Sequence, residues 1–117
     1  MTVEDWDAVV KVHLRGTFCP SKHAVAYWRE RSKAGNPAVA RIVNTSSPSG
    51  IYGNVGQANY GAAKGGVIGM VRATAPLLTA FGGTANAVAP PAWWTVNRAS
   101  VLAPSVFKPP TGQETRR

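Results

Sequence analysis

The sequence predicts part of an α/β domain built on a parallel sheet, and two observations lead to this class. Stretches with apolar residues at helical spacing alternate with short β-branched stretches, in the order helix, strand, loop, helix, strand. Strands joined by one helical crossover pair in parallel, and a stable parallel sheet needs more strands and cover on both faces. We therefore expect half of a doubly wound domain, whose other strands are absent from these 117 residues.

The first predicted element is a long helix over residues 3–33, in which apolar residues recur with helical periodicity. Thr2, followed three residues later by Asp5, forms a weaker version of the capping box that starts many helices. Gly16 and Pro20 lie in the middle of this helix. Because proline removes a backbone donor, we expect the helix to bend or split there.

Two short strands and a second helix follow. Residues 40–44 are partly β-branched and predict a buried strand, and residues 84–89 predict another. Residues 46–57 are rich in Gly, Ser and Pro, which favours an irregular loop. Residues 59–80 predict the second helix, although Pro76 inside it should remove one backbone hydrogen bond.

We divide the chain into an α/β segment over residues 1–92 and an irregular, proline-containing tail over residues 93–117. A chain of this length buries enough surface for one core. Its start is acidic and polar, unlike a signal peptide, and its uncharged stretches are too interrupted to span a membrane. The single Cys19 excludes an internal disulfide and a zinc finger, so we expect a cytoplasmic protein without a metal site.

The charge balance is strongly basic, with 13 Lys and Arg against 5 Asp and Glu. Such an excess attracts polyanions. However, the basic residues from Arg41 to Lys108 are scattered singly and are not interleaved with aromatic residues. We expect no nucleic-acid partner, and a polyanion-binding protein remains the weaker alternative.

Tyr60 and Lys64 are the first candidates for chemistry. Their spacing of four residues places both side chains on one face of the second helix. A nearby ammonium favours the phenolate form of a tyrosine, which suits the pair to proton exchange near neutral pH. Ser47 follows the first strand, so its hydroxyl should reach the same edge of the sheet. Each residue taken alone also has an ordinary structural explanation, and only their combination is specific.

Ser47, Tyr60 and Lys64 belong to a larger pattern of three stretches in a fixed order and spacing, namely residues 44–47, 53–64 and 86–90. Together they read Asn-Thr-Ser-Ser, then Gly-Asn-Val-Gly-Gln-Ala-Asn-Tyr-Gly-Ala-Ala-Lys, then Asn-Ala-Val-Ala-Pro. This block resembles the second half of the short-chain dehydrogenase/reductase family. The resemblance implies a partial Rossmann-like domain that lacks the N-terminal dinucleotide-binding half.

The resemblance also implies roles for individual residues. Tyr60 would be the general acid/base, Lys64 would favour its ionised form and hold the cofactor ribose, and Ser47 would orient the substrate. Pro90, together with Tyr60 and Lys64, would lie at the cofactor. His13 matches the position of a frequent active-site Asn of the family, although a histidine packed on the inner face of its helix is an equally good interpretation.

The implied reaction is hydride transfer between NAD or NADP and an alcohol or ketone. A His at position 13 resembles the dehydrogenase modules of peroxisomal multifunctional β-oxidation enzymes, which suggests a 3-hydroxyacyl thioester as substrate. Family members commonly pair through the two long helices, so we expect a homo-oligomer. The alternative is a truncated, non-catalytic remnant that binds no dinucleotide by itself, because the sequence has no Gly-rich phosphate-binding turn.

Overall fold

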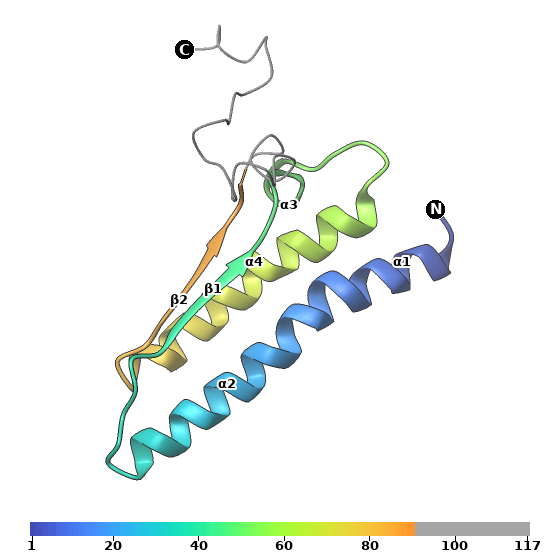
Figure 1. Ribbon diagram of the computed structural model, residues 1–117. Helices are drawn as coiled ribbons and strands as arrows, with labels where there is room; N and C mark the ends of the chain where they lie inside the picture. Colours follow the sequence, from blue (N-terminus) through green and yellow to red (C-terminus); the bar gives the residue numbers. More distant parts are fainter. Residues whose placement is uncertain (91–117) are drawn as a thin grey trace, which may run out of the picture.

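The computed structural model describes residues 1–90, and helices alternate with strands along them (Figure 1). Three consecutive helical segments form one continuous rod, namely α1 (Val3–Val10), η1 (Lys11–Arg15) and α2 (Gly16–Lys33). After the rod come β1 (Arg41–Thr45), α3 (Pro48–Tyr52), α4 (Ala58–Thr79) and β2 (Thr84–Val88). The predicted order of helices and strands is confirmed. The tail predicted for residues 93–117, with its Trp pair, lies outside the described residues.

The two strands pair in parallel, with Arg41 opposite Thr84 and Thr45 opposite Val88. Helix α4 is the crossover between them, and it runs back along the sheet beside the α1–η1–α2 rod (Figure 1). The predicted parallel pairing is therefore confirmed. Both strands end at the same edge of the sheet, which is the edge where the candidate site residues lie.

The core lies between the sheet and the helices. Ile42 and Ala85 face inward from the strands and meet Val71 and Leu78 of α4, while Val25 extends from α2 into the same cluster. Leu78 is completely buried. A core of this kind needs alternating burial along each strand, and both strands show it.

The opposite face of the sheet is exposed over the described residues. Val43, in the middle of β1, is 64% exposed, and Val88 at the end of β2 is 46% exposed. Parallel sheets are normally covered on both faces. This exposed face therefore agrees with the expectation that the chain forms half of a doubly wound domain.

The middle of the helical rod differs from the prediction. Neither Gly16 nor Pro20 splits the rod, and Pro20 lies inside α2. The irregularity occurs instead at η1, a π-helical turn. The Thr17 hydroxyl donates to the His13 carbonyl at 2.9 Å, so a side chain supplies that carbonyl with a partner. Because such turns depend on the placement of an extra residue rather than on a Gly or Pro, composition did not indicate it.

The prediction of an irregular loop over residues 46–57 is wrong in its first part, where α3 forms a short helix. Ser47 precedes the helix with an extended backbone and its side chain accepts a hydrogen bond from a backbone N–H of the first turn. Pro48 occupies the first helical position, and Gly53 ends the helix with a φ of 76°. Ser followed by Pro is a helix-start signal that outweighed the loop-like composition.

Helix α4 continues through Pro76 and ends at Thr79, close to its predicted end. Its buried side chains include Ala63, Lys64 and Val67, which lie in the half of the helix nearest the site. Within residues 1–90, neither α4 nor any other helix combines the length and apolar character needed to cross a membrane.

Candidate active site

The candidate site lies where β1 and β2 end and α4 begins. Tyr60 and Lys64 occupy the first two turns of α4, as their spacing predicts. The start of the rod is attached to the same region, because the Asn59 side chain donates to the Asp5 carbonyl at 3.3 Å. Asp5 in turn forms a capping box with Thr2, which confirms that prediction. Elements distant in sequence therefore converge at this edge.

Lys64 is buried, with 8% of its surface exposed. Its ammonium donates to the Thr45 carbonyl at 3.0 Å and lies 5.8 Å from the centre of the Tyr60 ring. A buried cation requires polar partners, and the face of an aromatic ring within about 6 Å also attracts it. The expected proximity of the amine to the phenol ring is therefore present.

His13 contacts Tyr60 directly. The two ring centres are 5.0 Å apart with an interplanar angle of 89°, an edge-to-face arrangement. His13 belongs to the π-helical turn η1, which packs against α4. Partial burial lowers the pKa of His13, and the nearby charge of Lys64 lowers it further. The imidazole is therefore held toward its neutral form beside the tyrosine.

Ser47 lies at the same edge, at the N-cap of α3. Its hydroxyl oxygen accepts a hydrogen bond of 3.2 Å from the backbone N–H of Ser49. This bond uses an acceptor site and leaves the hydroxyl proton free for another partner. Among the side-chain hydrogen bonds of residues 1–90, none joins Ser47 to Tyr60 or Lys64.

Glycines bring α3 close to α4. A methyl group added at Gly50 would lie 2.6 Å from two backbone atoms of Lys64 and Gly65, and one added at Gly61 would lie 3.1 Å from the Ser49 carbonyl oxygen. The two helices therefore touch backbone to backbone, which places the Ser47 cap beside the Tyr60–Lys64 turn. The predicted site did not include Gly50, because glycine in a Gly-rich stretch signals a turn rather than a helix contact.

Ser46 is a second residue that the predicted site omits. It is 3% exposed, and its hydroxyl donates to the Lys64 carbonyl at 2.8 Å. Ser46 and Ser47 are adjacent in sequence, yet only the second is accessible. Pro90, the predicted cofactor contact, follows β2 by two residues and is partly buried at the same edge.

Comparison of the chain with known proteins identifies its family. The family model described as short chain dehydrogenase matches residues 1–104. The chain belongs to the short-chain dehydrogenase family. The resemblance inferred from residues 44–90 is thereby confirmed.

Two curated relatives have similar levels of identity. This short-chain dehydrogenase chain is 47% identical over 92 residues to a hydroxyacyl-CoA dehydrogenase of Mycobacterium tuberculosis, an alignment covering 77% of the chain and 29% of that relative. It is 47% identical over 90 residues to a 3-oxoacyl-[acyl-carrier-protein] reductase of Synechocystis, covering 77% of the chain and 34% of that relative. The chain therefore spans about a third of these relatives.

Solved structures agree with the partial Rossmann-type fold. A short chain dehydrogenase from Mycobacterium avium matches with a TM-score of 0.76 and 48% identity, covering 79% of this chain and 32% of that one. The full-length peroxisomal multifunctional enzyme type 2 from Drosophila melanogaster matches with a TM-score of 0.67 and 38% identity, covering 76% of this chain and 16% of that one. The two-stranded sheet and its helices thus match one part of each of these larger structures.

The surroundings of His13 predict a pH dependence of stability in this short-chain dehydrogenase chain. Its pKa is lowered by folding from an ordinary value of 6.5, so the unfolded chain binds a proton first as the pH falls. The His13 contribution to stability is complete above pH 6.5 and is lost as the pH falls through the folded pKa. We expect His13→Asn to remove this contribution, measured as a smaller fall in the urea midpoint between about pH 7.5 and about pH 5.

His23→Asn is the matched control, because His23 is an exposed residue on the same rod. It removes an exposed imidazole that takes no part in the Tyr60 contact, so its slope of urea midpoint against pH is the reference for the His13→Asn slope. Equal slopes for the parent chain and His13→Asn would contradict the account of His13.

Proposed function

We propose that this chain carries the proton-transfer residues of an NAD(P)-dependent oxidoreductase that interconverts an alcohol and a ketone. One observation carries the proposal, namely the buried Lys64 ammonium 5.8 Å from the centre of the Tyr60 ring at the carboxyl edge of a parallel sheet. Family membership supports the same reaction class. The chain spans about a third of the relatives reported above, so the activity of a whole enzyme is part of this proposal.

Tyr60 is the proposed proton carrier. During oxidation its phenolate oxygen takes the hydroxyl proton of the alcohol, and during reduction its phenol returns a proton to the carbonyl oxygen. The Lys64 ammonium places a positive charge 5.8 Å from the centre of the Tyr60 ring. Ser47 donates its free hydroxyl proton to the substrate oxygen and so orients the reacting carbon. His13 packs edge-on against the Tyr60 ring and limits its movement.

The residues present fit the ribose end of a nicotinamide cofactor. The Lys64 ammonium has three donors and uses one on the Thr45 carbonyl, so two remain for ribose hydroxyls. Tyr60 and Pro90 lie at the same edge and complete the proposed contacts. NAD or NADP supplies the hydride acceptor or donor when it is bound.

For the pyrophosphate of the dinucleotide, the sequence offers no comparable binding residues. The sequence contains no Gly-x-Gly-x-x-Gly turn, the backbone feature that holds a dinucleotide pyrophosphate. The second candidate is a non-catalytic remnant of the family that binds no dinucleotide by itself, and the titration below distinguishes the two. The exposed outer face of the sheet is consistent with either candidate.

A 3-hydroxyacyl or 3-oxoacyl thioester is the proposed substrate class. Two of the relatives named above act, by their names, on hydroxyacyl-CoA and on a 3-oxoacyl group carried by acyl carrier protein. A 3-oxoacyl group has its ketone carbon two bonds from the acyl carbonyl carbon. Acetoacetyl-CoA is therefore the simplest test substrate.

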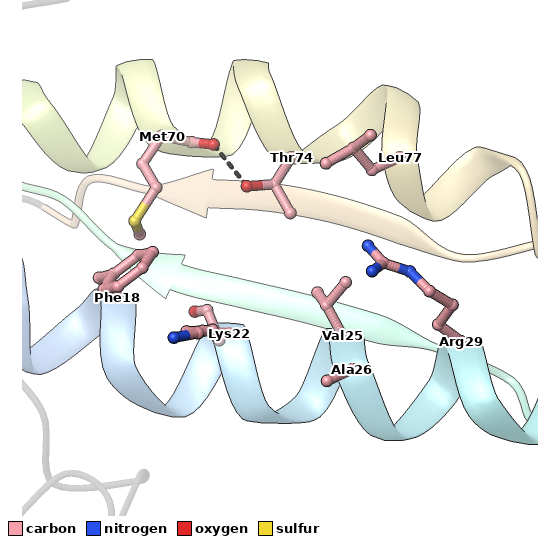
Figure 2. Close-up of a pocket in the computed structure, with 9 residues that line it drawn as sticks. Phe18, Lys22, Val25, Ala26, Arg29, Met70, Thr74 and Leu77 are labelled. Carbon is pink, nitrogen blue, oxygen red and sulfur yellow. Dashed lines mark hydrogen bonds between the residues drawn. The ribbon is translucent and has the colours of Figure 1, made fainter.

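We also propose that the chain forms a homo-oligomer through the rod and α4. A groove of about 260 Å³ lies between α2 and α4 (Figure 2). Phe18, Met70 and Leu77 give it an apolar lining, and Lys22 and Arg29 lie along its α2 side. The rod is acidic in its first turns and basic near its end. An antiparallel pair of rods would place opposite charges together.

Titration with NADH and NADPH, followed by tryptophan fluorescence and by acetoacetyl-CoA turnover, tests the oxidoreductase proposal. We expect saturable quenching and measurable turnover. Tyr60→Phe should retain quenching and lower turnover by a factor of about 10² to 10⁴, because it removes the transferable proton. Tyr52→Phe is the matched control, since Tyr52 is 86% exposed, and it should behave like the parent chain. No quenching at millimolar cofactor would favour the truncated remnant.

A further inference from the structure

Ser46 connects three elements at the candidate site. Its backbone N–H donates to the Val88 carbonyl at 2.7 Å, which extends the pairing of β1 with β2 by one residue. Its hydroxyl donates to the Lys64 carbonyl at 2.8 Å, which joins the end of β1 to α4. The side chain is 3% exposed, so this second bond is shielded from water. A buried hydroxyl with a good partner is costly to remove.

Thr45 and Ser46 hydrogen-bond to two different groups of Lys64. The Thr45 carbonyl accepts from the ammonium at 3.0 Å, and the Ser46 hydroxyl donates to the main-chain carbonyl. A carbonyl oxygen has two lone pairs, so the Lys64 carbonyl accepts from Ser46 without giving up its place in the helix. We call these two contacts the Thr45–Ser46 clamp. The clamp restrains both ends of the lysine, its backbone and its charged group.

We propose that Ser46 is a positioning residue, which fixes the backbone of Lys64 so that the ammonium stays between the Thr45 carbonyl and the Tyr60 ring. The proposal deepens the proposed function and rests on it, because the position of Lys64 has chemical meaning only if Tyr60 transfers protons. Ser46 acts through Lys64 and does not reach the substrate, since it is buried. Its neighbour Ser47 has the accessible hydroxyl.

The packing around the clamp explains why a hydroxyl is needed at this position. Gly50 and Gly65 bring the backbones of α3 and α4 together, with a methyl group added at Gly65 lying 3.1 Å from the Gly50 carbonyl oxygen. This contact restrains α4 from the side of α3. It offers no donor to the Lys64 carbonyl, whereas Ser46 supplies one from the sheet. The helix is thereby tied to both neighbours of the site.

Trace acetylation of the full chain with acetic anhydride, read by mass spectrometry, tests the clamp without any cofactor. The measured quantity is the labelling of Lys64 divided by that of Lys33, whose side chain is 67% exposed. Removing one buried hydrogen bond should raise this ratio by a factor of about two to ten in Ser46→Ala. Ser46→Thr keeps the hydroxyl and should restore a ratio within a factor of about two of the parent.

Two control variants separate positioning from general loosening. Ser49→Ala removes a hydroxyl that donates to the Gln57 side chain in the same region, and it should leave the ratio unchanged. Val71→Ala weakens the core of α4 and should lower the melting temperature without raising the ratio. If Ser46→Ala does not fold, Ser46→Cys, with its weak S–H donor, replaces it and should give a ratio above those of the parent and of Ser46→Thr, and a ratio equal to the parent's would overturn the clamp.

The outcomes are distinguishable. A Ser46→Ala ratio equal to that of Ser49→Ala, or an equal rise in Val71→Ala, would overturn the clamp and leave the oxidoreductase proposal standing. A raised ratio that Ser46→Thr restores supports the clamp. If that result is obtained and cofactor binding is absent, the clamp stands as a structural fact and the proposed function fails.

Discussion

Gly50→Ala is expected to lower the free energy of unfolding by about 3 kcal/mol and to disturb the site. The added methyl group would lie 2.6 Å from both the Gly65 nitrogen and the Lys64 carbonyl carbon. Both are backbone atoms, so rotation of a side chain cannot relieve the contact. Helix α3 must therefore move away from α4 and carry Ser47 with it. Urea unfolding measures the loss, and amide exchange measured along α4 locates the disturbance.

Gly69→Ala is a matched control on the same helix pair. Gly69 lies within α4, and a methyl group added there meets nothing within 4 Å. Alanine is the better helix former, so this variant should be neutral or more stable by up to about 1 kcal/mol. If both variants unfold at the same urea concentration, the backbone contact between α3 and α4 does not limit stability.

Leu78→Ala should destabilise the chain by about 2 to 5 kcal/mol. Leu78 is completely buried and packs in the core against residues of both strands and α2. Truncation leaves a cavity that the surrounding side chains fill only in part. Thermal or urea unfolding, monitored by circular dichroism, gives the magnitude.

Leu77→Ala is the control for Leu78→Ala, and it also tests self-association of the chain. Leu77 is 53% exposed and lines the groove between α2 and α4. Leu77→Ala should change the free energy of unfolding of the monomer by no more than about 0.5 kcal/mol. If the chain associates through this groove, the same variant should raise its dissociation constant in sedimentation equilibrium. Equal destabilisation by the two leucine variants would contradict the core described for α4.

The order of elements could be predicted because it depends on local patterns. Helical periodicity located the rod and α4, and β-branched residues located both strands. Helix α3 was not predicted because the Gly and Ser content of residues 46–57 favours a loop, although Ser47 and Pro48 form a typical helix start. The π-helical turn at residues 11–15 was also missed, since no residue type marks such a turn.

Part of the site could be predicted as well. The spacing of Tyr60 and Lys64 placed both on one helical face, and the position of Ser47 after a strand placed it at the same edge. The roles of these residues and of Pro90 in catalysis and cofactor binding stay predictions. Ser46 and Gly50 could not be identified, because their importance comes from atoms of Lys64 and Gly65 that are distant in sequence.

The sequence by itself determined the two long helical stretches and the two strands, that the strands are parallel, and which residues share an edge of the sheet. Periodicity and chain connectivity are sufficient for those conclusions, because they act over a few residues or through one crossover. Only the tertiary structure decided that His13 meets Tyr60 edge-on and that Lys64 is held by Thr45 and Ser46. These contacts depend on how closely α4 approaches its neighbours, and Gly50 and Gly65 allow a close approach to α3 while Gly66 admits the Leu14 side chain of η1. Such packing involves residues distant in sequence, so no local pattern indicates it.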